Sequence, residues 1–233
     1  MLEPDHASRV PPSHGQPPAG LGGNPHVLQI LMTEHWSLLS ARSLGYTEAM
    51  SRASIFVAAL TGSVVALALV SQATDFGDGF IAFSLVLLPV VFFLGIVTIV
   101  RIGQINFEDA VWVQGMNRIR NAYHDLAPEL EPYFVTSRYD DDRGVTTSIG
   151  MPDVVPQKQA FIAIPGMIAV LDAVVAGATA GIALIGLDAD TVATIAVAVV
   201  VFLATVAGFV AWGVRSISRY RAQATIRFPS PDA

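Results

Sequence analysis

The residue best placed to do chemistry is Asp172, an acidic side chain near the middle of the apolar segment 161–185. A carboxylate near the centre of a bilayer costs about 2.5 to 3.5 kcal/mol on insertion scales, and such residues mark ion or proton pathways. Asp172 is therefore a candidate intramembrane polar site for a proton or a cation. The alternative is a structural carboxyl, either protonated or hydrogen-bonded to a hydroxyl of a neighbouring helix. Examples of such hydroxyls are Thr61, Ser63, Thr98 and Thr205.

Three pairs of adjacent residues combine types that bind metals or transfer protons, namely Glu34-His35, Glu108-Asp109 and His124-Asp125. Neighbours on a helix point about 100° apart, so neither member of a pair can share one ion with the other. We interpret the three pairs as solvated helix faces, with Asp109 as a polar residue that sets helix register. The run 140–142 is interpreted as solvated charge, because it lacks the central glycine and distal glutamate of a calcium-binding loop.

Several classes of function are disfavoured by what the sequence lacks. It contains no cysteine, and it has no nucleophile elbow, phosphate-binding loop, dinucleotide-binding turn or HExxH motif. Its formal charge of −6 does not favour nucleic acid as a partner. We therefore predict a protein that is not an enzyme and needs no cofactor or metal.

Composition and charge distribution indicate a membrane protein. Hydrophobic residues make up 53% of the chain and charged residues 14%, against about 25% charged in soluble domains. All 13 Lys and Arg residues lie outside the stretches 53–100 and 159–214, and each stretch is long enough to cross a hydrocarbon layer of about 30 Å twice. The predicted fold is an all-α membrane protein with four transmembrane helices in two hairpins.

The positions of proline, glycine and charged residues predict the limits and the location of the remaining segments. Amphipathic cytoplasmic helices are expected before the first span and after the second, and Gly45 is expected to end or bend the first of them. The positive-inside rule places both termini in the cytoplasm, and the expected location is the plasma membrane. The predicted segments are a disordered arm at 1–24, an amphipathic helix at 25–52, the first hairpin at 53–100, a helical extension at 101–127, a connector at 128–158, the second hairpin at 159–214 and a basic tail at 215–233.

Two patterns predict helix contacts. Apolar residues after the second span follow a coiled-coil-like spacing, and we interpret them as a cytoplasmic interaction face. This face consists of Ile105, Trp112, Met116, Ile119 and Tyr123. In the third span, small residues form a stripe suited to close helix packing. This stripe consists of Gly166, Ala173, Gly177 and Gly181.

The stretch 106–120, followed by Leu130-Glu-Pro-Tyr-Phe134, resembles an uncharacterised actinobacterial family of four-span integral membrane proteins. The resemblance covers about residues 27–220. It implies the four-span architecture and the membrane location, and it assigns no activity and no functional residues.

The sequence supports two hypotheses about function. In the first, the protein is a non-enzymatic interaction or assembly component whose cytoplasmic helices bind each other or a partner, which is a second copy or another membrane protein. In the second, it is a small oligomeric channel, transporter or membrane-permeabilising effector that uses Asp172. Both require the lipid bilayer as a partner.

Overall fold

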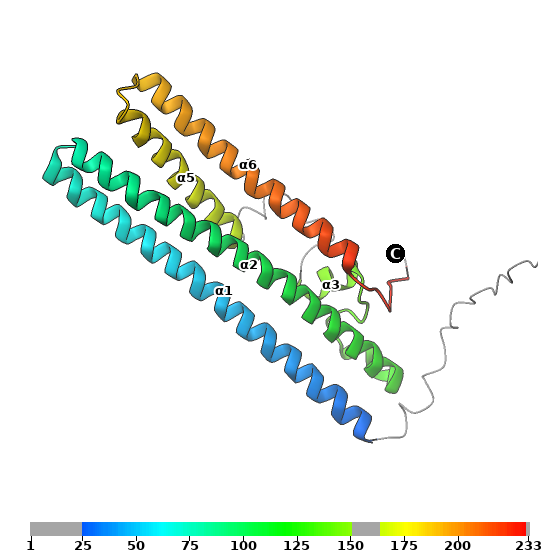
Figure 1. Ribbon diagram of the computed structural model, residues 1–233. Helices are drawn as coiled ribbons and strands as arrows, with labels where there is room; N and C mark the ends of the chain where they lie inside the picture. Colours follow the sequence, from blue (N-terminus) through cyan, green and yellow to red (C-terminus); the bar gives the residue numbers. More distant parts are fainter. Residues whose placement is uncertain (1–24, 151–163, 232–233) are drawn as a thin grey trace, which may run out of the picture.

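The computed structural model describes residues 25–150 and 164–231, and within these ranges all regular secondary structure is helical (Figure 1). The predicted disordered arm at 1–24 and the end of the connector lie outside the described residues. The elements are α1 (Pro25–Thr74), α2 (Asp78–Leu126), the 3-10 helix η1 (Pro128–Tyr133), α3 (Asp142–Ser148), α5 (Ile164–Ile185) and α6 (Thr191–Gln223).

Helix α1 is one continuous helix of 50 residues, so the expected end or bend at Gly45 was wrong. Gly45 is buried instead where α1 meets α2, and a Cβ at this position would lie 2.8 Å from Trp112 Cζ3. The glycine therefore makes room for an indole ring and does not end the helix. At 1.5 Å per residue α1 is about 75 Å long, more than twice the thickness of the hydrocarbon layer.

Helix α2 runs for 49 residues from the apolar region through Arg101 to Leu126, with Pro89 inside it. Neighbouring helices can satisfy the carbonyl freed by a membrane proline. Pro128 begins the 3-10 turn that follows. Half of α1 and half of α2 therefore lie beyond the apolar stretches.

Short turns join α1 to α2 and α5 to α6, at the same end of the molecule (Figure 1). In the first turn Asp75 and Phe76 adopt positive φ values of 46° and 58°. In the second, the Asp190 carboxylate accepts hydrogen bonds from the backbone N–H groups of Val192 (2.9 Å) and Ala193 (3.0 Å) and so caps α6.

Helix α2 is the central element, because it packs against α1 on one side and α5 on the other, and α5 in turn packs against α6. The main core lies along these contacts and includes Phe56 of α1, Ile99 and Ile102 of α2, and Ile168 and Val175 of α5. The order of the helices in space therefore follows their order in the chain.

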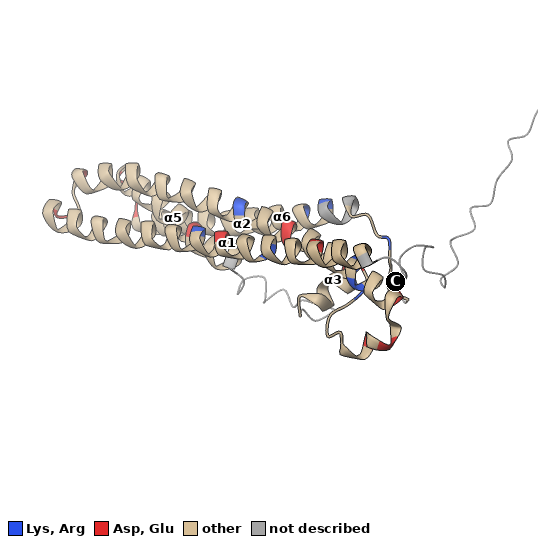
Figure 2. Cartoon of the chain, turned by 90° about the horizontal axis from the view of Figure 1, so that it is seen from below, with Lys and Arg blue, Asp and Glu red and all other residues tan. Residues whose placement is uncertain are grey.

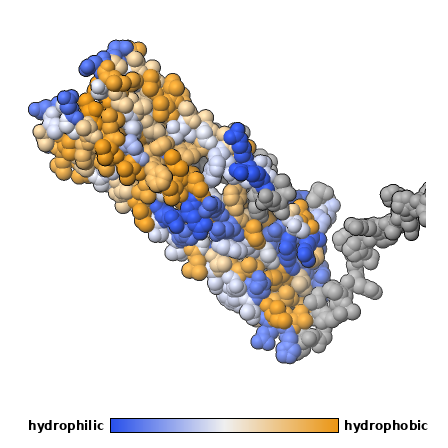
Figure 3. Space-filling view, viewed as in Figure 1, coloured by the Kyte–Doolittle hydropathy of each residue, from blue (hydrophilic) through white to orange (hydrophobic). Residues whose placement is uncertain are grey.

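Within residues 25–150 and 164–231, four helices are each long and apolar enough to cross a membrane. Their outer faces expose large apolar side chains, for example Val86 and Phe93 of α2 and Leu203 of α6. Figure 3 shows the apolar surface gathered at the end with the two turns, and Figure 2 shows Lys and Arg from about the middle of the bundle to the other end. Exposed apolar surface of this extent defines a membrane protein, which confirms the predicted all-helical membrane class.

Candidate functional site

Asp172 lies on the side of α5 that faces α2, and its side chain is fully buried. The carboxyl group sits directly against the backbone of α2 at Gly95, where an added Cβ would lie only 2.0 Å from Asp172 Oδ1. Neither carboxylate oxygen has a hydrogen-bond partner among the described residues. The site is thus a single acid enclosed between two helices, with glycine opposite it.

The hydroxyl groups considered as partners of Asp172 all bond to their own helices. Each donates to the carbonyl oxygen four residues earlier, at 2.8 Å. These groups are Thr61, Ser63, Thr98 and Thr205. The hydrogen-bonded version of the structural interpretation of Asp172 was therefore wrong.

Small residues of α5 lie on a different side of the helix, against α6. A Cβ at Gly177 would lie 2.8 Å from the carbonyl oxygen of Ala198, and one at Gly181 would lie 3.6 Å from the Ala198 Cβ. Ala173 is fully buried and Gly166 is partly buried. Small residues let helix backbones approach closely in membranes, so α5 uses one side for α6 and another, with Asp172, for α2.

The predicted interaction face of α2 is largely used within the chain. Ile105, Met116 and Ile119 are buried, while Trp112 and Tyr123 are partly buried. Val113 and Met116 form a small core with Val145, against which Leu38 and Ile149 pack. Within one copy, this face therefore contacts α1 and the chain after Tyr139.

Ion pairs join α1 to α2 just beyond the apolar stretches. Arg42 Nε lies 2.7 Å from Asp109 Oδ1, so Asp109 has an interhelical partner. The Glu48 carboxylate accepts hydrogen bonds from Arg101 Nε (2.9 Å) and Arg52 Nε (2.8 Å), and Glu108 also pairs with Arg101. These two arginines lower the pKa of Glu48 to about 2.

Asp140 and Asp141 are buried, so their interpretation as solvated charge was wrong. Asp140 accepts hydrogen bonds from the backbone N–H groups of Arg227 (3.0 Å) and Phe228 (2.7 Å), and Arg118 Nε lies 2.7 Å from its Oδ2. Asp141 caps α3 through the Gly144 N–H (2.7 Å) and accepts a second bond from the Ser230 N–H (2.7 Å). Burial raises the pKa of Asp141, but these hydrogen bonds outweigh it and hold the pKa below its ordinary value.

The end of the chain is therefore docked onto α2, although the sequence predicted a basic tail extending from α6. The backbone N–H of Asp140 donates to the Phe228 carbonyl (3.1 Å), and Gln114 Nε2 donates to the Asp140 carbonyl (2.8 Å). Arg118 also donates to the Thr225 carbonyl. We call residues 224–231 the docked tail. The local Asp141-x-x-Gly144 capping pattern was the one signal in the sequence for this arrangement.

The three acidic or acid-histidine pairs form no metal site. His35 lies near Tyr123, with ring centroids 6.3 Å apart, and burial, together with the charge of Arg120, lowers the His35 pKa. His124 Nε2 lies 3.0 Å from Glu131 Oε2. In the part of the chain that the structure describes, no three His, Asp or Glu side chains gather around a possible ion.

A charge-free apolar stripe is exposed along the half of α1 that extends beyond the apolar stretch. We call it the α1 seam. Its residues are spaced 4-3-4-3-4 and all are exposed, with Trp36 at 63% and Tyr46 at 65%. They are Met32, Trp36, Leu39, Ser43, Tyr46 and Met50. The spacing is the seven-residue period of helix pairs, and sequence analysis missed it because a second apolar face, toward α2, overlaps it.

The fold and these sites define an integral membrane protein with a folded, polar end. Comparison with known proteins adds no name to this class, because no family model, no curated protein and no solved structure matches the chain. The resemblance carried by residues 106–120 therefore stays a prediction.

Proposed function

We propose that the protein is a non-enzymatic assembly component of the plasma membrane that pairs with a second copy of itself through the α1 seam. Two transmembrane hairpins anchor it, and the folded end formed by α1, α2, α3 and the docked tail lies in the cytoplasm. The observation that carries the proposal is the exposure of the seam, a heptad-spaced surface with no covering residue in the described ranges.

The neighbouring faces of α1 explain why α2 does not cover the seam. Two charged residues of this part of α1 form ion pairs with α2, Arg42 with Asp109 and Glu48 with Arg101. These pairs fix which side of α1 meets α2, and the seam lies beside that side. It is therefore available to another helix without disturbing the fold.

A second copy fits the seam better than an unrelated soluble partner, because the surface continues into the apolar half of α1 as exposed small and β-branched residues. These residues are Ser54, Val57, Thr61, Val64 and Ala68. Small residues favour helix contact in lipid. Two copies inserted with the same orientation would align both halves of α1 in parallel and in register.

Disulfide crosslinking tests this pairing directly, because the natural chain contains no cysteine. Leu39→Cys and Tyr46→Cys should each give a crosslinked dimer in native membranes, since residues on a parallel seam face their own copies. Ser37→Cys, exposed on the opposite side of α1, is the matched control and should remain monomeric. Equal crosslinking of Ser37→Cys, or none at either seam position, contradicts the proposal.

The buried carboxyl of Asp172 favours a second candidate function, proton or cation movement. An acid without a hydrogen-bond partner at the α2–α5 contact is a potential proton-binding group. The Asp172 side chain is completely buried within one copy, whereas a residue that lines an ion pathway would be accessible to water. This function therefore ranks second. Proton flux into liposomes that is lost in Asp172→Asn supports it, whereas equal flux for both proteins removes it.

A further inference from the structure

An arginine near the end of α2 lacks an acidic partner. Arg120 is partly buried, and its Nη1 donates a hydrogen bond to Asn117 Oδ1 (2.7 Å). No carboxylate is ion-paired with it among the described residues, and Tyr123 and the like-charged Arg42 act on its pKa with opposite effects. Burial, followed by Arg42, lowers the pKa of Arg120. A desolvated guanidinium of this kind is well suited to bind an anion.

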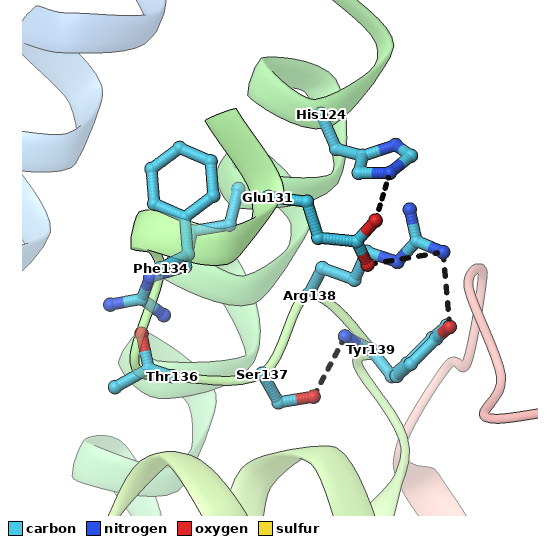
Figure 4. Close-up of a pocket in the computed structure, with 8 residues that line it drawn as sticks. His124, Glu131, Phe134, Thr136, Ser137, Arg138 and Tyr139 are labelled. Carbon is cyan, nitrogen blue, oxygen red and sulfur yellow. Dashed lines mark hydrogen bonds and ion pairs between the residues drawn. The ribbon is translucent and has the colours of Figure 1, made fainter. Parts of the chain in front are cut away.

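Arg120 borders a cavity of about 160 Å³ between the end of α2 and the segment that returns along it (Figure 4). Helix α2 contributes Arg120 and His124, η1 contributes Glu131, and the returning segment contributes Thr136, Ser137 and Arg138. Arg138 lies over the Tyr139 ring, 5.2 Å from its centroid. Two arginines thus approach one cavity from different elements.

The charge balance of the cavity is positive. Arg120 and Arg138 contribute two positive charges and Glu131 one negative charge, which leaves +1 with His124 neutral. Glu131 Oε2 lies 3.0 Å from His124 Nε2, and Glu131 Oε1 lies 4.0 Å from Arg138 Nη2. The Glu131 side chain is 59% exposed, so it occupies the rim and can rotate into solvent when another anion enters.

We propose that this cavity binds the phosphate group of a soluble phosphorylated small molecule through Arg120 and Arg138. Arginine binds phosphate oxygens through paired N–H donors. The volume corresponds to about five water molecules at roughly 30 Å³ each. It lies below the roughly 300 to 1,000 Å³ of drug-sized sites, so the phosphate enters and the rest of the ligand stays outside.

The distance from the apolar region favours a soluble ligand over a lipid headgroup. Arg120 lies 19 residues along α2 from Arg101 (120 − 101), which is about 28 Å at 1.5 Å per residue. This exceeds the Debye length of about 8 Å at physiological ionic strength. Headgroup phosphates at the membrane surface therefore lie out of reach of a helix that stands away from the bilayer.

Calorimetric titration of the full chain with inorganic phosphate, in nanodiscs of phosphatidylcholine at constant ionic strength, tests the site. We expect saturable binding that weakens at least tenfold in Arg120→Gln and Arg138→Gln. Arg219→Gln removes the same charge from an exposed position of α6 and should bind like wild type. Glu131→Gln should bind more tightly, since it removes the competing carboxylate, whereas Glu129→Gln, its exposed neighbour, should not.

The gain of binding in Glu131→Gln keeps the test decisive if an arginine variant does not fold. No saturable binding by wild type, equal weakening in Arg219→Gln, or equal affinities for Glu131→Gln and Glu129→Gln would each overturn the site. Arg120-dependent stabilisation that occurs only in nanodiscs containing phosphatidic acid would overturn the soluble ligand and assign a lipid headgroup.

Discussion

At the scale of single residues, Asp172 and Gly95 form a matched pair at the α2–α5 contact. The carboxyl group occupies the space that a side chain at Gly95 would need, with an added Cβ at 2.0 Å from Oδ1. Glycine at position 95 is therefore required by the acid opposite it. Measurements of stability test the packing of Asp172 against Gly95 independently of any transport function.

We predict that Gly95→Ala lowers the free energy of unfolding by about 1 to 3 kcal/mol, the usual cost of inserting a methyl group into a packed core. Asp172→Ala in the same chain should restore most of the loss, because it removes the carboxyl that the methyl group meets. Gly62→Ala is the matched control, since nothing lies within 4 Å of a Cβ there. Thermal unfolding in detergent measures all three, and a Gly95→Ala variant as stable as Gly62→Ala contradicts the packing described.

A second residue-scale prediction concerns Glu48, whose pKa falls from 4.5 to about 2 through Arg101 and Arg52. A carboxyl with a lowered folded pKa stabilises the fold above the unfolded pKa, and this stabilisation is lost as pH falls toward 2. Glu48→Gln should therefore melt below wild type at pH 7, and the difference should shrink between pH 4.5 and pH 2. The effect is small because the pair is solvent-exposed.

Melting temperatures of wild type and Glu48→Gln across this pH range provide the measurement. Glu34→Gln, at an exposed position of the same helix, is the control and should show no such convergence. A constant difference between Glu48→Gln and wild type down to pH 2 would count against the Glu48 ion pairs.

At the scale of elements, two adjacent aspartates fasten the docked tail to α2. The Asp140 carboxylate accepts hydrogen bonds from the backbone N–H groups of Arg227 and Phe228. The Asp141 carboxylate accepts one from the Ser230 N–H and also caps α3. Buried carboxylates with several charge-assisted hydrogen bonds fix a local structure strongly. The docked tail and α3 therefore form one unit with the distal half of α2.

We predict that Asp140→Ala releases the docked tail. Loss of a buried acceptor leaves its donors unsatisfied at a cost of about 1 to 3 kcal/mol, so trypsin should cleave after Arg227 roughly tenfold faster or more. Limited proteolysis followed by mass spectrometry measures the rate. Glu129→Ala, at an exposed position of η1, is the control, and equal cleavage of the two variants would mean that Asp140 does not hold the tail.

At the scale of the whole molecule, the two ends differ in the charged side chains that they carry. The described Lys and Arg residues lie from about the middle of the bundle to the end away from the two turns (Figure 2), and the turns carry Asp75, Asp78, Asp188 and Asp190. This asymmetry supports the proposed orientation, with the turns outside the cell.

The orientation predicts labelling by a membrane-impermeant maleimide. Leu187→Cys, in the turn before α6 and 75% exposed, should react in intact cells. Val135→Cys, at the opposite end and 96% exposed, should react only after the cells are permeabilised. Labelling of Val135→Cys in intact cells would reverse the proposed topology.

Hydropathy and charge in the sequence alone determined the membrane class, the helical content and the approximate limits of the apolar helices. These features are local, because a bilayer requires each span to satisfy its own backbone and to be apolar along its length. Pro25, Pro128 and Asp190 mark helix limits for equally local reasons of capping and backbone geometry.

Only the tertiary structure decided how each helix surface is used, because that depends on residues distant in the sequence. Met116 was predicted to lie on an interaction face, and the structure shows that Leu38 of α1 and Val145 pack there. Asp140 was interpreted as solvated, but it accepts a hydrogen bond from the N–H of Phe228, 88 residues away. Gly45 was expected to end or bend a helix, but the structure shows that the Trp112 ring fills the space that a Cβ at Gly45 would need. A carboxylate or a glycine has no fixed role until its neighbours set its solvation and the space around it.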